Sequence, residues 1–182
     1  MVFARQLRGG DDGELDSDLF TVPADGGTVT RLTRDHRSMR PEWGARGIAY
    51  ERIAPLTSRT GHPAVNLVQP GGTGMRLLAR SPHSVPIEGF WPIAWSRDGT
   101  RLVLNDDGDS TEGWAVNLTT GRARDLTGRR DDVSADGISA DGRTVLVEGG
   151  RGGLSTMPFA GGRQTSLGVH WFMAGWSWSG GP

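Results

Sequence analysis

The strongest candidate for a catalytic nucleophile is Ser177, within residues 175–181, which read Gly-Trp-Ser-Trp-Ser-Gly-Gly. In the arrangement that this pattern suggests, a nucleophilic serine lies on a sharp strand-to-helix turn, with glycine two residues later and with Asp and His supplied by other segments. Ser179 stands where that glycine is required, and the sequence ends at Pro182 before such partners. We therefore expect Ser177 not to be catalytic, assign no catalytic residue and expect no enzyme activity.

Two acidic stretches, residues 11–18 and 105–112, could supply oxygen ligands for a hard cation such as Ca²⁺. Neither has the spacing of an EF-hand, because glycine is misplaced and the closing Glu is absent. Their position between neighbouring apolar segments favours solvated Asp/Gly loops, with a calcium loop as the alternative. We expect no metal site and no cofactor.

The four histidines are too far apart in the sequence to have the ligand spacing of a zinc site. They are His36, His62, His83 and His170. The chain contains no cysteine, which excludes disulfides, thiolate metal sites and cysteine nucleophiles.

The composition indicates a folded, turn-rich chain: 29 of its 182 residues are Gly and 10 are Pro, while 35% are hydrophobic. All 20 basic residues are Arg, scattered along the chain, and the net charge is −1. Nucleic acids and membrane surfaces require a concentrated positive field, so we expect neither as a partner. The N-terminus lacks the apolar stretch of a signal peptide, which favours the cytoplasm, or the periplasm or secretion if a leader is missing.

A repeat organises the chain. A short apolar strand, a Gly-containing turn and a second strand recur with glycines at 27, 72, 121 and 162, at steps of 45, 49 and 41 residues. Between these copies, Asp98-Gly99 and Asp141-Gly142 each connect two apolar strands, as tight hairpin turns do. Each period thus holds four short strands, which predicts an all-β fold, a β-propeller of about four four-stranded blades.

We expect one domain over residues 1–182, with repeats at approximately 1–40, 41–80, 90–130 and 135–182. The strand at residues 1–5 and the segment at 174–180 would together complete one blade. The blades would form a small closed ring, or a partial propeller completed by a missing segment or by a second copy of the chain. The tryptophans at first-strand positions are expected to pack in the core: Trp43, Trp95, and Trp176 or Trp178.

These repeats resemble the TolB-type, or PD40, β-propeller repeat over nearly the whole chain. The resemblance is carried by Trp95-Ser96-Arg97-Asp98-Gly99 and by residues 19–27, which end in Pro-Ala-Asp-Gly-Gly. The Pro-Ala-Asp-Gly-Gly motif is also similar to sequences in the propeller domains of tricorn-type and prolyl oligopeptidase-type peptidases. Residues 175–181 resemble the nucleophile elbow of the latter peptidases, apart from the extra Ser179. The matching residues form turns and core, so the resemblance implies an architecture more than an activity.

In a propeller, the connections that lead into the first strands crowd around one face. Arginines, histidines and aromatics in those connections are typical anchors of a binding surface, although Trp91 and Trp171 could instead pack under loops. The candidate binding residues are His36, Arg40, Trp91, Asp132, His170 and Trp171.

The sequence therefore predicts a non-catalytic propeller module that binds a protein or peptide through its loop face. The first alternative is the substrate-gating propeller of a prolyl oligopeptidase-type serine peptidase without its hydrolase domain. The second is a sugar- or lactone-active propeller enzyme, for which the sequence offers no recognisable set of metal ligands.

Overall fold

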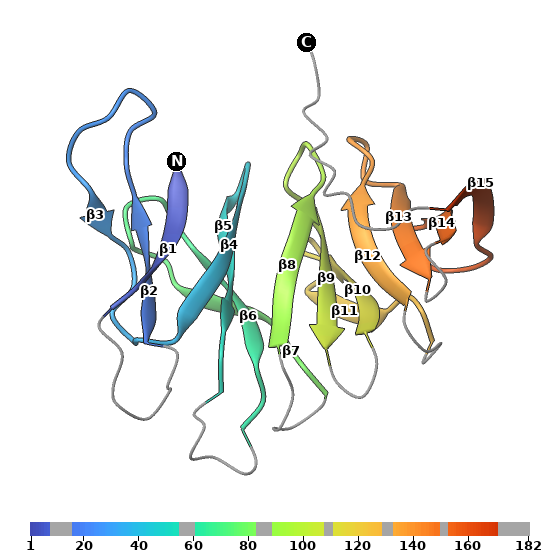
Figure 1. The fold of residues 1–182 in the computed structure, drawn as a ribbon, viewed down its shortest axis with the longest axis horizontal. Helices are drawn as coiled ribbons and strands as arrows, with labels where there is room; N and C mark the ends of the chain where they lie inside the picture. The colour runs from blue at the N-terminus through green and yellow to red at the C-terminus, as the bar shows by residue number, and fades with distance from the viewer. Residues whose placement is uncertain are drawn as a thin grey trace. The chain divides into compact units, whose positions relative to one another are not determined.

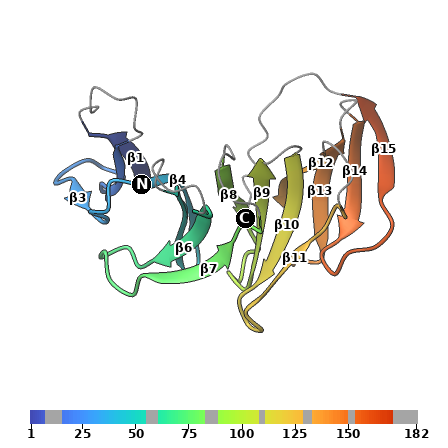
Figure 2. The same cartoon turned by 90° about the horizontal axis from the view of Figure 1, so that it is seen from below.

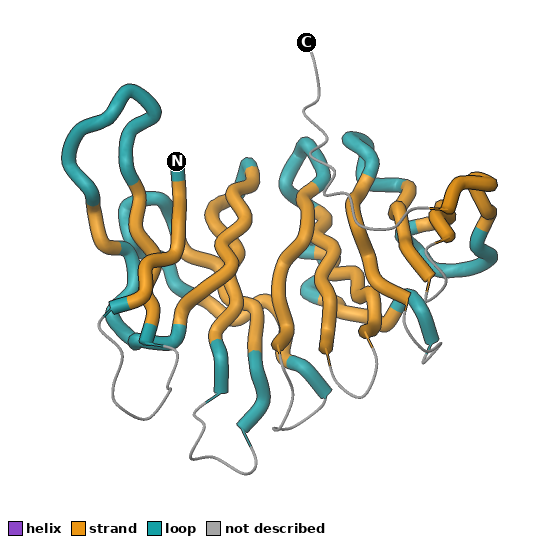
Figure 3. The backbone as a smooth tube through the Cα atoms, in the orientation of Figure 1, coloured by secondary structure: helices purple, strands orange, loops and turns teal. Residues whose placement is uncertain are grey.

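The computed structural model describes residues 1–7, 16–54, 61–82, 89–107, 111–128, 133–149 and 153–170. All regular elements in these ranges are β-strands (Figure 3). Within the same ranges there is no helix long and apolar enough to cross a membrane. The chain divides into two compact units, Met1–Pro92 and Ile93–Pro182.

The first unit contains two antiparallel sheets (Figure 1). One sheet consists, in order, of β1 (Val2–Gln6), β2 (Ser17–Thr21) and β3 (Thr30–Arg31). The other consists of β4 (Ser38–Gly44), β5 (Gly47–Arg52), β6 (Ala64–Val68) and β7 (Arg76–Arg80). A parallel bridge between Ser17 and Arg37 connects the start of β2 to the residue before β4.

The core of the first unit forms because alternate residues of a strand share one face of the sheet. Ile48 and Tyr50, two residues apart on β5, are fully buried and pack with Leu19 of β2. Leu32 and Val68 complete this cluster. Burying a side chain of this size stabilises the fold by about 1.5–3 kcal/mol.

The second unit continues from β8 (Gly89–Trp95), whose first four residues belong to the first unit. The further strands are β9 (Arg101–Asp107), β10 (Thr111–Asn117), β11 (Arg122–Asp125), β12 (Val133–Ile138), β13 (Thr144–Gly149), β14 (Gly153–Pro158) and β15 (Thr165–His170). Figure 2 shows β12 to β15 side by side. A parallel pairing of Glu112 with Val133 connects β10 to β12.

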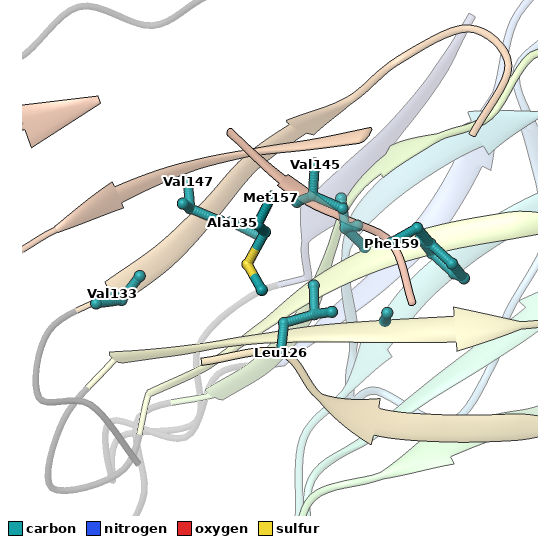
Figure 4. Packing of buried hydrophobic residues seen from close by; sticks show 9 residues of the cluster. Leu126, Val133, Ala135, Val145, Val147, Met157 and Phe159 are labelled. Atoms are coloured by element: carbon teal, nitrogen blue, oxygen red, sulfur yellow. The ribbon is translucent and has the colours of Figure 1, made fainter. Parts of the chain in front are cut away.

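The core of the second unit consists of short aliphatic side chains, Met157 and Phe159 (Figure 4). Val145 and Val147 alternate on β13, and Ala135 lies on the neighbouring β12. Ile138 of β12 is partly buried and packs against this cluster.

A four-stranded antiparallel meander occurs three times in succession, as β4–β7, β8–β11 and β12–β15, after the three-stranded sheet β1–β3. This arrangement confirms the predicted all-β, propeller-like fold. The predicted closing strand, residues 174–180, lies outside the described residues, as does Ser177.

The two Asp-Gly turns predicted from the sequence have the same geometry. Gly99 and Gly142 have φ of 66° and 70°, a region that glycine enters without steric penalty. In both turns a serine side chain contacts the Asp: the Oγ of Ser96 donates to Asp98 at 2.7 Å, and that of Ser139 donates to Asp141 at 2.6 Å.

The expectation that Trp43 packs in the core is wrong. Trp43 is 45% exposed, because β4 is an edge strand of its sheet and Trp43 lies next to the turn into β5. Trp95 is partly buried, and Trp176 and Trp178 lie outside the described residues.

Only the ends of the two acidic stretches lie within the described residues, and buried polar side chains of strands are found there, contrary to the expectation of solvated loops. Asp18 is fully buried on β2, where it pairs with Arg31 and accepts a hydrogen bond from the Thr33 hydroxyl at 3.0 Å. In the second stretch, Asn105 is buried and holds β12 through its side-chain bonds to the backbone of Ala135. These polar side chains can be buried in the sheets because each has hydrogen-bond partners there.

Candidate binding site

Two of the six predicted binding residues meet in the first unit, Arg40 of β4 and Trp91 of β8. His36 lies in the connection between β3 and β4, where its Nδ1 is 2.7 Å from a carboxylate oxygen of Asp16. His170 is the last residue of β15, in the second unit. Asp132 and Trp171 lie outside the described residues.

Arg40 occupies a β-bulge. The register of β4 with β5 passes from Met39–Glu51 to Glu42–Ala49, so Arg40 and Pro41 together lie opposite Tyr50. Arg40 has a φ of 46°, an unusual conformation for a residue with a Cβ and one further disfavoured before proline. Bulges redirect side chains, and strained backbone of this kind is concentrated at functional sites.

The Arg40 guanidinium lies over the indole ring of Trp91, with its central carbon 4.3 Å from the ring centroid. One of its nitrogens, Nη1, donates to Oε2 of Glu51 at 3.1 Å. The Arg40 side chain is 44% exposed, and Trp91 is partly exposed. Together, the cation–π contact and the ion pair restrict the orientation of an accessible Arg.

Glu51, which binds Arg40, is fully buried. Its Oε1 accepts a hydrogen bond from the backbone N–H of Phe90 at 3.0 Å. Burial raises the pKa of Glu51, while the positive charge of Arg40 and the Phe90 N–H act in the opposite direction. Both carboxylate oxygens thus hold other groups in place, which suits a positioning role.

Gly89 makes the close approach of these residues feasible. A Cβ at this position would lie 2.6 Å from Oε1 of Glu51, 2.7 Å from Nη1 of Arg40 and 2.9 Å from Cε3 of Trp91. Real Cβ atoms do not come this close to other heavy atoms, so any other residue would displace part of the cluster. We call Arg40, Glu51, Gly89 and Trp91 the Arg40–Trp91 site.

Sequence reasoning missed Glu51 and Gly89. The signal for Glu51 was a single acidic residue within the otherwise apolar strand at residues 47–51, and Gly89 directly precedes the Phe90-Trp91 pair. Neither pattern reveals the contact, because 37 residues separate these two positions in the chain. Over the residues that the structure describes, no group of three His, Cys, Asp or Glu could hold a metal ion.

No protein family and no curated protein matches the sequence significantly. Solved structures do match. TolB from Acinetobacter baumannii is 19% identical, with a TM-score of 0.64 over 91% of this chain and 41% of that one. A putative TolB from Agrobacterium tumefaciens is 16% identical, with a TM-score of 0.58 over 84% of this chain and 55% of that one.

A third similar structure is oligogalacturonate lyase in complex with manganese, 17% identical, with a TM-score of 0.55 over 83% of this chain and 42% of that one. The chain thus spans between about two fifths and just over half of the length of these proteins. At such identities the likeness concerns the fold, and it agrees with the recurring four-stranded sheets. The chain therefore has the fold of a TolB-like β-propeller.

Proposed function

We propose that the chain is a non-catalytic β-propeller module that binds a protein or peptide partner through the Arg40–Trp91 site. The observation that carries this proposal is an accessible Arg stacked on a Trp, held by a buried carboxylate and a strained bulge. Trp and Arg are the residue types that most often dominate binding energy at protein interfaces.

Folding already orders the Arg40 side chain before a partner binds. A free arginine side chain loses up to about 2 kcal/mol of conformational entropy when it is immobilised. Glu51 and Trp91 already restrict Arg40 in the unbound chain, so less entropy is lost when a partner binds. A carboxylate of the partner could approach the exposed part of the guanidinium, while an apolar or aromatic group covers the indole.

The gating propeller of a serine peptidase remains an alternative without specific support. A lyase among the similar structures is no evidence for a peptidase, and Ser177 lies outside the described residues. The binding proposal does not depend on this alternative, because it requires only residues of the first unit.

The proposal can be tested with peptides selected from a random phage-displayed library on the full 182-residue chain. We expect Trp91→Ala to weaken the selected peptides about tenfold or more, as for an interface anchor. Trp43→Ala is the matched control, because Trp43 is a half-exposed tryptophan on β4 outside the site. Affinities would be measured by fluorescence polarisation, with circular dichroism to verify folding.

A second variant covers the case in which Trp91→Ala does not fold. Arg40→Lys keeps the charge but loses the planar group that stacks on the indole, and we expect it to weaken the same peptides. If no peptide is enriched, or if the peptides bind the Trp91, Arg40 and Trp43 variants as well as the wild type, the proposal is wrong.

A further inference from the structure

A cavity of about 550 Å³ lies in the first unit, and its lining includes none of the four residues of the Arg40–Trp91 site. It is bordered by the connection before β4, the end of β5, and the strands β6 and β7. A volume of this size is typical of pockets for small organic ligands. Its charged lining residues are Asp35, Arg37, Arg52, Arg76 and Arg80.

The charge of this lining is unbalanced. Asp35 is the one carboxylate among the described residues of the lining, and it accepts a hydrogen bond from Nε of Arg52 at 2.6 Å. It also accepts one from the Ser38 hydroxyl at 2.6 Å. Burial alone would raise the pKa of Asp35, but the hydrogen bonds from Ser38, Arg52 and the Arg37 backbone together lower it. Asp35 is therefore a carboxylate already committed to its neighbours.

The other three arginines of the lining have no such partner among the described residues. In the described part of the chain, no carboxylate forms an ion pair with Arg37, Arg76 or Arg80. His62 adds a ring whose Nδ1 is 3.0 Å from the carbonyl oxygen of Ser81. The pocket thus has a positive excess although the whole chain carries a net charge of −1.

The sheet register explains how two of the arginines share the cavity. Ala64 of β6 pairs with Arg52 on one side and with Arg80 on the other, and directly paired residues point to the same face. The small Ala64 leaves open space between the two long side chains. Asn66, two residues further along β6, faces the same side and also lines the cavity.

The lining also has an apolar part. Ala54 and Ala64 are buried, and Leu77 is 50% exposed at the outer strand. Cations on an edge strand such as β7 also hinder edge-to-edge pairing, which could account for Arg76 and Arg80 alone. That role does not account for Arg37 and Arg52, which come from other segments and line the same cavity.

We propose that this pocket binds an organic polyanion with two or more carboxylates on a short aliphatic framework. Guanidinium groups bind carboxylates by charge-assisted, often bidentate, hydrogen bonds, and the alanines and Leu77 would contact the carbon framework. A free polycarboxylate and the side chains of an acidic peptide have this same chemistry. The proposal is independent of the Arg40–Trp91 site.

Isothermal titration calorimetry on the full chain tests the pocket, with citrate as the free polycarboxylate and acetyl-Glu-Glu-Glu-amide as the peptide. We expect saturable binding of at least one, and the tighter of the two identifies the source. Acetyl-Gln-Gln-Gln-amide is the neutral control for the peptide. We expect Arg80→Gln to weaken binding about tenfold, the loss of one charge-assisted hydrogen bond.

Arg46→Gln is the matched control, because Arg46 is an exposed arginine of the same unit in the turn between β4 and β5. We expect it to bind the ligand as the wild type does. Absence of binding with both probes, or equal weakening by Arg46→Gln and Arg80→Gln, would overturn the proposal. Inorganic phosphate binding as tightly as citrate would overturn the assignment to polycarboxylates.

Discussion

Arg40 and Trp91 stack on one another, with 4.3 Å between the guanidinium carbon and the ring centroid, although 50 residues separate them in the chain. Arg40 lies in the first strand of one four-stranded group, and Trp91 lies in the first strand of the next. Glu51 connects the two strands, because it binds the Arg40 side chain and the Phe90 backbone at once. The stability of this site and its capacity to bind a partner should therefore depend on the same residues.

Arg40→Ala should destabilise the chain more at alkaline than at acidic pH. Burial already raises the pKa of Glu51, and loss of the opposing Arg40 charge raises it further. Above the unfolded value near 4.5, the folded variant would then hold more protons than the unfolded chain, so its stability falls as pH rises. The stability difference would be measured as melting temperatures of wild type and variant from about pH 4 to about pH 8, a range that covers the protonated and the ionised form of a glutamate.

Glu51→Gln in the Arg40→Ala background serves as the control for that experiment. It removes the titrating group while it keeps the shape of the side chain, so the additional pH dependence should disappear. A melting-temperature difference between wild type and Arg40→Ala that stays constant with pH would show that Glu51 is not influenced by Arg40.

Gly89→Ala should cost about 1–3 kcal/mol, the range for overpacking a close-packed site. The added methyl group would collide with the side chains of Glu51, Arg40 and Trp91 together. Gly71→Ala is the matched control in the same unit, since a Cβ there meets nothing within 4 Å. Urea denaturation measures both, and equal midpoints for the two variants would contradict the close approach at Gly89.

Asp136→Asn should stabilise the chain at neutral pH. Burial, with the nearby charge of Glu148, raises the pKa of Asp136 from 3.8 to about 6. Between these values the folded chain binds more protons than the unfolded chain, so the contribution of Asp136 to stability falls as pH rises. The melting temperature of the Asn variant, relative to wild type, should therefore increase from about pH 4 to about pH 7, the range over which Asp136 ionises.

Asp141→Asn, in the same unit, should show the opposite pH dependence: its melting temperature relative to wild type should decrease as pH rises. Hydrogen bonds from the Ser139 hydroxyl and the Arg143 backbone lower the pKa of Asp141. Asp141 thus contributes stability above its unfolded value of 3.8, which is lost as pH falls through the lower folded value. The same response for both Asn variants would indicate a general charge effect instead of local environments.

The turns were predictable from the sequence because their causes are local. Gly99 and Gly142 follow an Asp that a nearby serine binds, so a few consecutive residues determine each backbone conformation. The all-β fold followed from the spacing of such turns. Trp43 shows the limit of this reasoning, because the exposure of a strand residue depends on whether its strand lies at the edge of the sheet.

The burial of polar residues could not be predicted in the same way. Asp18 looks like part of a solvated acidic loop until Arg31, Thr33 and the backbone of His36 are placed around it. Arg40 and Trp91 were chosen for their residue types, but their contact, and the contribution of Glu51 and Gly89, depend on strands far apart in the chain.

The sequence alone determined the repeated short strands, the positions of the tight turns and hence the propeller-like architecture. These follow from backbone preferences and from apolar alternation over a few residues. Only the tertiary structure decided which charges are buried, which arginines share a cavity and which side chains stack. These properties depend on the register of paired strands and on the packing of sheets, and neighbouring residues in the sequence do not encode them.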